Sequence, residues 1–115
     1  MLNFDNETQV ITMVAKDTGD FVFKLDNYIL DDGDVLFFTV NDDIEKAGTP
    51  LIQKRIDSFK DGAALIRLSA QETNLPVGKY YYDIEVNTAD GRVDTVVGPA
   101  KFKIKGGVKY LWKIM

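Results

Sequence analysis

Acidic side chains provide most of the groups in this sequence that could do chemistry, and two clusters are dense enough to suggest a metal site. Their members are Asp31, Asp32, Asp34, Asn41, Asp42 and Asp43. If both clusters met at one end of a β-sheet domain, their oxygen atoms would suit Ca²⁺. They do not fit the twelve-residue register of a helix-loop-helix calcium loop, and Asp favours turns for conformational reasons alone. We therefore expect turns here and no bound metal, with calcium as the alternative.

Catalytic groups are scarce. Asp83 and Glu85 lie two positions apart, which on one strand face places them roughly 7 Å from each other. A carboxylate pair can hydrolyse a glycoside, but alternating acids are also what a solvated strand face contains. The sequence has no His to activate Ser58 or Ser69, and no Cys to act as a nucleophile or metal ligand. We predict a protein that is not an enzyme and uses no cofactor.

Composition limits the partners. The chain has 115 residues, enough for one domain with a real core, and a formal net charge of −4. Its basic residues are scattered along the sequence, which argues against nucleic acid as a partner. No apolar run is long enough to cross a membrane, and the N-terminus does not resemble a signal peptide. We expect neither a membrane partner nor secretion through a leader.

Alternation of apolar and polar residues organises most of the chain. Tyr80, Tyr82, Ile84 and Val86 share one face of a strand that ends at the Asp90-Gly91 turn. Residues 1–7 are expected to be a frayed lead-in, and 51–56 an edge strand carrying Lys and Arg. The other expected strands are 8–15, 21–25, 35–40, 64–68 and 93–104. Seven or eight short strands separated by turns predict an antiparallel β-sandwich.

Three local motifs add detail. Leu75, Gly78 and Tyr80 have the spacing of a tyrosine corner, in which the Tyr hydroxyl bonds to upstream backbone in Greek-key sandwiches. The segment 69–72 has the spacing of a capping box and predicts one helical turn. Pro99 lacks the N–H that a ladder needs, so we expect it at an edge or a bulge.

The C-terminal segment is treated separately from the sandwich, which we assign to residues 1–106. Residues 107–115 follow a Gly-Gly pair and alternate between apolar residues and a mainly Lys face. The apolar face consists of Val108, Tyr110, Trp112 and Ile114. Such a segment should pack on its own sheet or add as a strand to a neighbouring subunit, and we favour the neighbour. Tyr81, Tyr110 and Trp112 could alternatively form a platform for a sugar.

The chain also resembles a known family. The resemblance is carried by segments 34–40, 75–84, 90–93, Gly98 and 102–104, and it extends from about Phe21 to Ile104. These segments are similar to the immunoglobulin-like N-terminal domain of phage baseplate upper proteins and related tail and prophage modules. The resemblance implies an immunoglobulin-like sandwich that acts as a structural subunit in a virion, or in the bacterial cytoplasm during assembly. Its expected partners are other virion subunits or further copies of itself, as a homo-oligomer. The alternative is a carbohydrate-binding or cell-surface-binding module.

Overall fold

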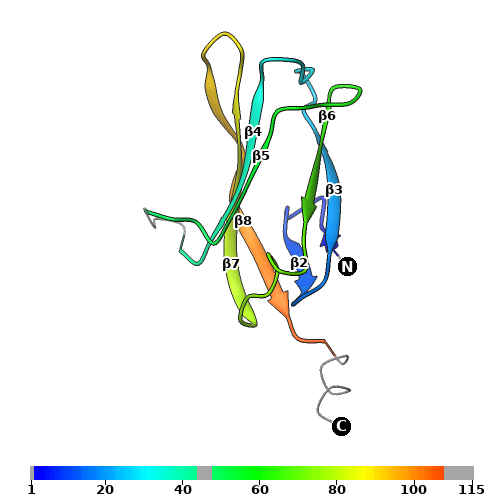
Figure 1. Ribbon diagram of the computed structural model, residues 1–115, viewed down its shortest axis with the longest axis vertical. Coiled ribbons are helices and arrows are strands. Elements are labelled where there is room, and N and C mark those ends of the chain that lie inside the picture. Colours follow the sequence, from blue (N-terminus) through cyan, green and yellow to red (C-terminus); the bar gives the residue numbers. More distant parts are fainter. Residues whose placement is uncertain (1, 44–47, 108–115) are drawn as a thin grey trace.

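The computed structural model describes residues 2–43 and 48–107, which form eight β-strands and no helix (Figure 1). Within this part of the chain, therefore, no helix is available to cross a membrane. The strands are β1 (Leu2–Phe4), β2 (Ile11–Val14), β3 (Gly19–Lys24), β4 (Val35–Asn41), β5 (Ile52–Ile56), β6 (Ala63–Leu68), β7 (Gly78–Asn87) and β8 (Val93–Lys105).

The strands form a six-stranded sheet in the order β1-β2-β8-β7-β4-β5 and a two-stranded sheet of β3 and β6. In Figure 1 the β3–β6 pair stands apart from β4, β5 and β7. β5 lies at the edge of the large sheet, as predicted. The expectation of purely antiparallel pairing is wrong, because β2 runs parallel to β8, with Ile11 beside Phe102. Short turns favour antiparallel neighbours, whereas this pair joins the two ends of the chain.

A single core lies between the inward faces of the strands. Alternate residues of β4, β6 and β7 are buried, which is the period-two pattern read from the sequence. Phe38 is fully buried at the centre. Its ring centroid lies 5.7 Å from that of Phe21, 5.4 Å from that of Tyr82 and 6.3 Å from that of Phe102. Aromatic side chains from β3, β4, β7 and β8 thus join the two sheets.

The predicted frayed lead-in is instead strand β1. Leu2 pairs with Met13 and Phe4 with Ile11, so β1 and β2 form a hairpin. The carboxylate of Asp5 accepts hydrogen bonds from the backbone N–H groups of Glu7 and Thr8 in the turn. The Phe4 ring stacks on Phe21, with centroids 6.3 Å apart. Long-range packing thus orders a segment whose polar composition indicated fraying.

Pro99 lies beside a bulge, as predicted. Tyr82 pairs with Ala100 and Ile84 with Val97, so β8 has one more residue than β7 over this stretch. Gly98 has φ 105°. A Cβ atom there would lie only 2.6 Å from the backbone oxygen of Tyr82. The close approach of the two strands therefore requires glycine at this position.

Candidate functional site

The Tyr80 hydroxyl donates a hydrogen bond to the backbone oxygen of Pro76 at 2.6 Å, which is the bond that a tyrosine corner makes. Tyr80 is buried near the start of β7, and Leu75 packs against the core. Gly78 does not have positive φ, and a Cβ atom there would have no neighbour within 4 Å. The turn therefore does not depend on glycine's conformational freedom at this position.

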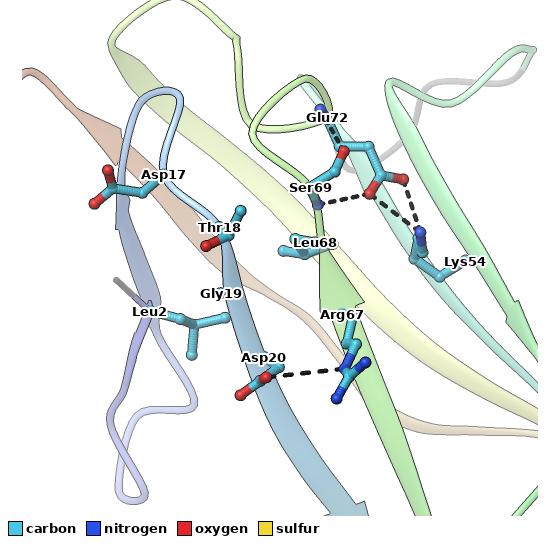
Figure 2. A pocket seen from close by; sticks show the side chains of 10 residues that line it. All are labelled: Leu2, Asp17, Thr18, Gly19, Asp20, Lys54, Arg67, Leu68, Ser69 and Glu72. Atoms are coloured by element: carbon cyan, nitrogen blue, oxygen red, sulfur yellow. Dashed lines mark hydrogen bonds and ion pairs between the residues drawn. The ribbon is translucent and has the colours of Figure 1, made fainter.

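A hollow of about 850 Å³ opens where β3 begins and β6 ends. Leu2 and the 17–20 segment line it on one side, and Lys54 and Glu72 line it on the other (Figure 2). Asp20 and Arg67 contact each other across β3 and β6, at 3.9 Å and with both side chains largely exposed. The hollow exists because a two-stranded sheet is too narrow to cover a six-stranded one.

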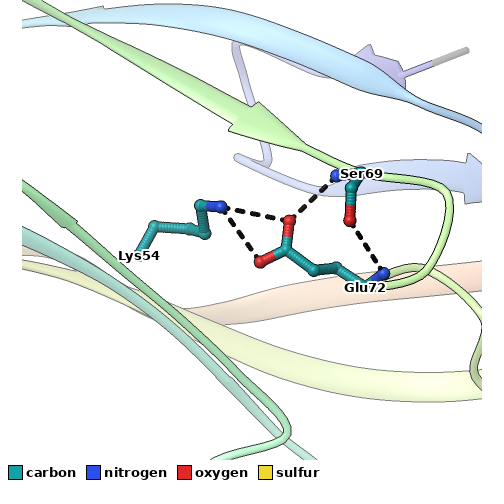
Figure 3. Close-up of polar contacts among 3 residues, drawn as sticks. All are labelled: Lys54, Ser69 and Glu72. Carbon is teal, nitrogen blue, oxygen red and sulfur yellow. Dashed lines mark hydrogen bonds and ion pairs between the residues drawn. The ribbon is translucent and has the colours of Figure 1, made fainter.

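A polar network closes one side of this hollow (Figure 3). The Lys54 ammonium donates to both carboxylate oxygens of Glu72, at 3.1 and 3.0 Å. The backbone N–H of Ser69 donates to Glu72, and the backbone N–H of Glu72 donates to the Ser69 hydroxyl. These two bonds form the capping box predicted from the sequence, around a single turn rather than a longer helix.

The network stabilises structure and offers little catalytic power. Burial opposes ionisation of Glu72, but bonds from the Ser69 N–H and from Lys54 outweigh it and lower the pKa of the carboxyl group. A carboxylate with a lowered pKa and occupied oxygens is a weak general base. Because Lys54 belongs to β5 and Glu72 follows β6, the ion pair fastens the two sheets together.

The acidic clusters do not form the calcium site considered as the alternative. Asp34 precedes β4 and Asn41 ends it, so the two clusters lie about 20 Å apart, at opposite ends of one strand. No group of three or more acidic side chains able to hold a metal occurs in residues 2–43 and 48–107. The 31–34 cluster serves as a turn, in which Asp34 N–H donates to the backbone oxygen of Asp31 at 3.1 Å.

Asp34 is the most connected of these acids, and it is almost completely buried. Its carboxylate accepts hydrogen bonds from the Tyr28 hydroxyl at 3.0 and 2.9 Å, from the Asp31 N–H at 3.0 Å and from the Ala89 N–H at 3.0 Å. Burial would raise the pKa of Asp34, but these bonds outweigh it and lower the pKa. The side chain therefore links the segment before β4 to the β7–β8 turn.

The carboxylate pair considered for glycoside hydrolysis lies on β7. Asp83 and Glu85 share the outward face of β7 with half-buried Tyr81, opposite Thr39 and Phe37 of β4. Burial raises the pKa of Asp83.

The two serines considered as nucleophiles also have no activating base in the sequence, which contains no His. Ser58 is exposed, and the Ser69 hydroxyl is used in the capping box.

Four lysines gather on the outward face of β7 and β8. We missed this group in the sequence because we treated the basic residues as scattered. Lys79 on β7 pairs directly with Lys103 on β8, and Lys101 and Lys105 flank it two positions away. All four side chains are exposed. Like charges opposite one another in a sheet are unfavourable, so this lysine face lowers the stability of the β7–β8 pairing. The alternation at 101, 103 and 105 is visible in the sequence, but the pairing with Lys79 requires the strand register.

The tail candidates Val108, Tyr110, Trp112 and Ile114 lie outside the described residues, as do two members of the expected sugar platform. No protein-family model and no curated protein matches this chain.

Proposed function

We propose that the chain folds as an immunoglobulin-like sandwich. The support is the strand order, because β4, β7 and β8 stand beside one another as strands C, F and G do in that fold. β3 and β6 pair as strands B and E, and β5 takes the position of an added C′ strand beside β4. Tyr80 lies near the start of β7, the strand corresponding to F, where the tyrosine corner of this fold belongs.

On this fold we propose a non-enzymatic assembly module of a phage or prophage tail or baseplate, located in the virion or in the host cytoplasm during assembly. The observation that carries the proposal is the incomplete second sheet, whose two strands leave strand edges and hollows beside the core. Such edges dock other chains by strand addition. The resemblance of the sequence to baseplate domains is the reason for proposing a phage particle as the assembly.

Light scattering over a range of protein concentrations tests the assembly function. We expect the full chain to form species larger than a monomer. A monomer at all concentrations, together with no binding to tail proteins encoded beside its gene, would refute the proposal. Neighbouring genes for tail or capsid proteins would support the assignment to a phage particle.

A further inference from the structure

One half of strand β8 has a neighbour on one side only. β2 pairs with β8 from Phe102 to Lys105, and no described strand extends that pairing toward Val93. On its other side, β8 pairs with β7 as far as Val93. Residues 93–97 therefore present a strand edge to which another strand can add, before the bulge at Gly98 and Pro99 interrupts the ladder.

A groove of about 310 Å³ lies beside this edge. Leu25, Val86 and Val96 give it an apolar lining, and Val86 is fully buried beneath it. Tyr28, Asp90, Arg92 and Asp94 form its polar part. A strand added to the edge would place alternate side chains in the groove, which is how strand addition gains specificity.

The groove lies at an acidic end of the molecule. A hydrogen bond to Asp34, together with the charges of Asp34, Asp90 and Asp31, raises the pKa of Tyr28 beside the groove. Arg92 is paired with Asp94 at 3.4 Å, which leaves the acids in excess. An occupant with cationic side chains is therefore favoured.

The segment 107–115 of this chain has the required pattern. Val108, Tyr110, Trp112 and Ile114 alternate with Lys109 and Lys113, so one face is apolar and the other mainly basic. The apolar face suits the apolar lining of the groove, and the lysines on the opposite face give the segment the positive charge that this acidic end of the molecule attracts.

The segment cannot lie along residues 93–97 of its own molecule. Val97, where the edge ends, is about 26 Å along β8 from Lys105. The chain from Lys105 to Tyr110 spans at most about 18 Å. The middle of the segment therefore cannot pair with residues 93–97 of the same chain, and a second copy must supply it.

We propose that residues 107–115 of one copy add as a strand to the β8 edge of the next copy, at residues 93–97, with apolar side chains in the adjoining groove. This inference rests on the proposed assembly function and names the docking site for it. The contact uses different surfaces on the two copies, so it is heterologous and builds rings or filaments rather than closed two-fold dimers.

Disulfide trapping tests the docking site, because the natural chain has no cysteine. Val93→Cys is mixed under oxidation with Lys109→Cys or, separately, with Lys113→Cys, because Val93 lies on the face of β8 opposite the groove-lining Asp94 and Val96, where the lysines of an added strand would also lie. Since an added strand can run in either direction, we expect one of the two mixtures to give the mixed dimer in high yield. Val22→Cys is the matched control, because Val22 is 65% exposed and Val93 is 63% exposed, but Val22 lies on β3 outside the groove. We expect at least a tenfold lower yield with it.

Deletion of residues 107–115 separates this inference from the proposed function. If the full chain assembles and the deletion variant is monomeric, with a melting temperature close to that of the full chain, the tail is the docking segment. Larger species that persist after deletion would refute the tail inference and leave the assembly function standing. Equal trapping at Val93 and Val22 would refute the groove as the docking site. A full chain that is monomeric at all concentrations would refute the self-docking itself.

Discussion

Replacing Asp34 with alanine should remove the acceptor that joins the segment before β4 to the β7–β8 turn. Its carboxylate receives the Tyr28 hydroxyl, the Asp31 N–H and the Ala89 N–H, and the residue is only 2% exposed. Truncation to alanine would take the carboxylate away from both backbone donors, and buried donors left without a partner are costly.

The expected loss is about 3 to 5 kcal/mol in the free energy of unfolding. Each hydrogen bond to a charged group contributes roughly 1.5–3 kcal/mol net, and three donors are involved. Relief of the desolvation cost of the carboxylate offsets part of the simple sum. Asp34→Asn retains one acceptor oxygen and should lose less.

Urea unfolding followed by circular dichroism measures this loss, with Asp32→Ala as the control. Asp32 is exposed in the same turn, so its replacement should change the free energy of unfolding by no more than about 0.5 kcal/mol. A loss below about 1 kcal/mol for Asp34→Ala would refute the assignment of Asp34 as the link between these segments.

The same carboxylate makes the stability depend on pH. The pKa of Asp34 is lower in the folded protein than its usual value, so its contribution is present at neutral pH. That contribution should disappear as the pH falls below about 4 and through the folded pKa. The difference in stability between the natural chain and Asp34→Asn should therefore shrink over that range. A difference that stays constant from pH 7 to the acid limit would contradict the lowered pKa.

Four further predictions concern the corner, the bulge and calcium. Tyr80→Phe should lower the free energy of unfolding by about 1 kcal/mol, because the bond to Pro76 is lost; an unchanged urea midpoint would contradict this. Gly78→Ala should cost nothing and can add about 0.4–1 kcal/mol, since the position has open space and no positive φ; a clear loss would mean that the turn requires glycine. Gly98→Ala should cost about 2 kcal/mol or more, because its Cβ would collide with the Tyr82 backbone at positive φ; a stable variant would contradict this. Millimolar calcium should leave the melting temperature unchanged, and a rise with calcium but not magnesium would reveal a site.

Local patterns predicted what depends on neighbours in sequence. The period-two alternation around Tyr82 and Ile84 predicted a strand with one buried face, and the spacing of Leu75 and Tyr80 predicted the hydroxyl bond. The Ser69 capping box also follows from spacing alone. The partners in the corner and in the capping box are within four residues, and a strand's alternation is read along the strand itself, so composition and spacing contain the information.

Features that depend on distant partners were not predictable in the same way. β1 forms because Leu2 and Phe4 meet β2 and Phe21, which their polar neighbours do not indicate. The lysine face exists only in the register that places Lys79 opposite Lys103. The separation of the two acidic clusters in space likewise follows from the length of β4, which runs between them.

The parallel pairing of β2 with β8 has a consequence for the order of folding. Joining Ile11 to Phe102 closes a loop of nearly the whole chain, so its entropy cost is among the largest of any contact here. The local β7–β8 hairpin should therefore form first, and β2 should dock late. During synthesis β2 leaves the ribosome long before its partner does, and Ile11 and Met13 stay without their β8 neighbours until residues 102–105 emerge. We therefore expect folding on the ribosome to wait for β8, with the β1–β2 hairpin exposed to other chains until then.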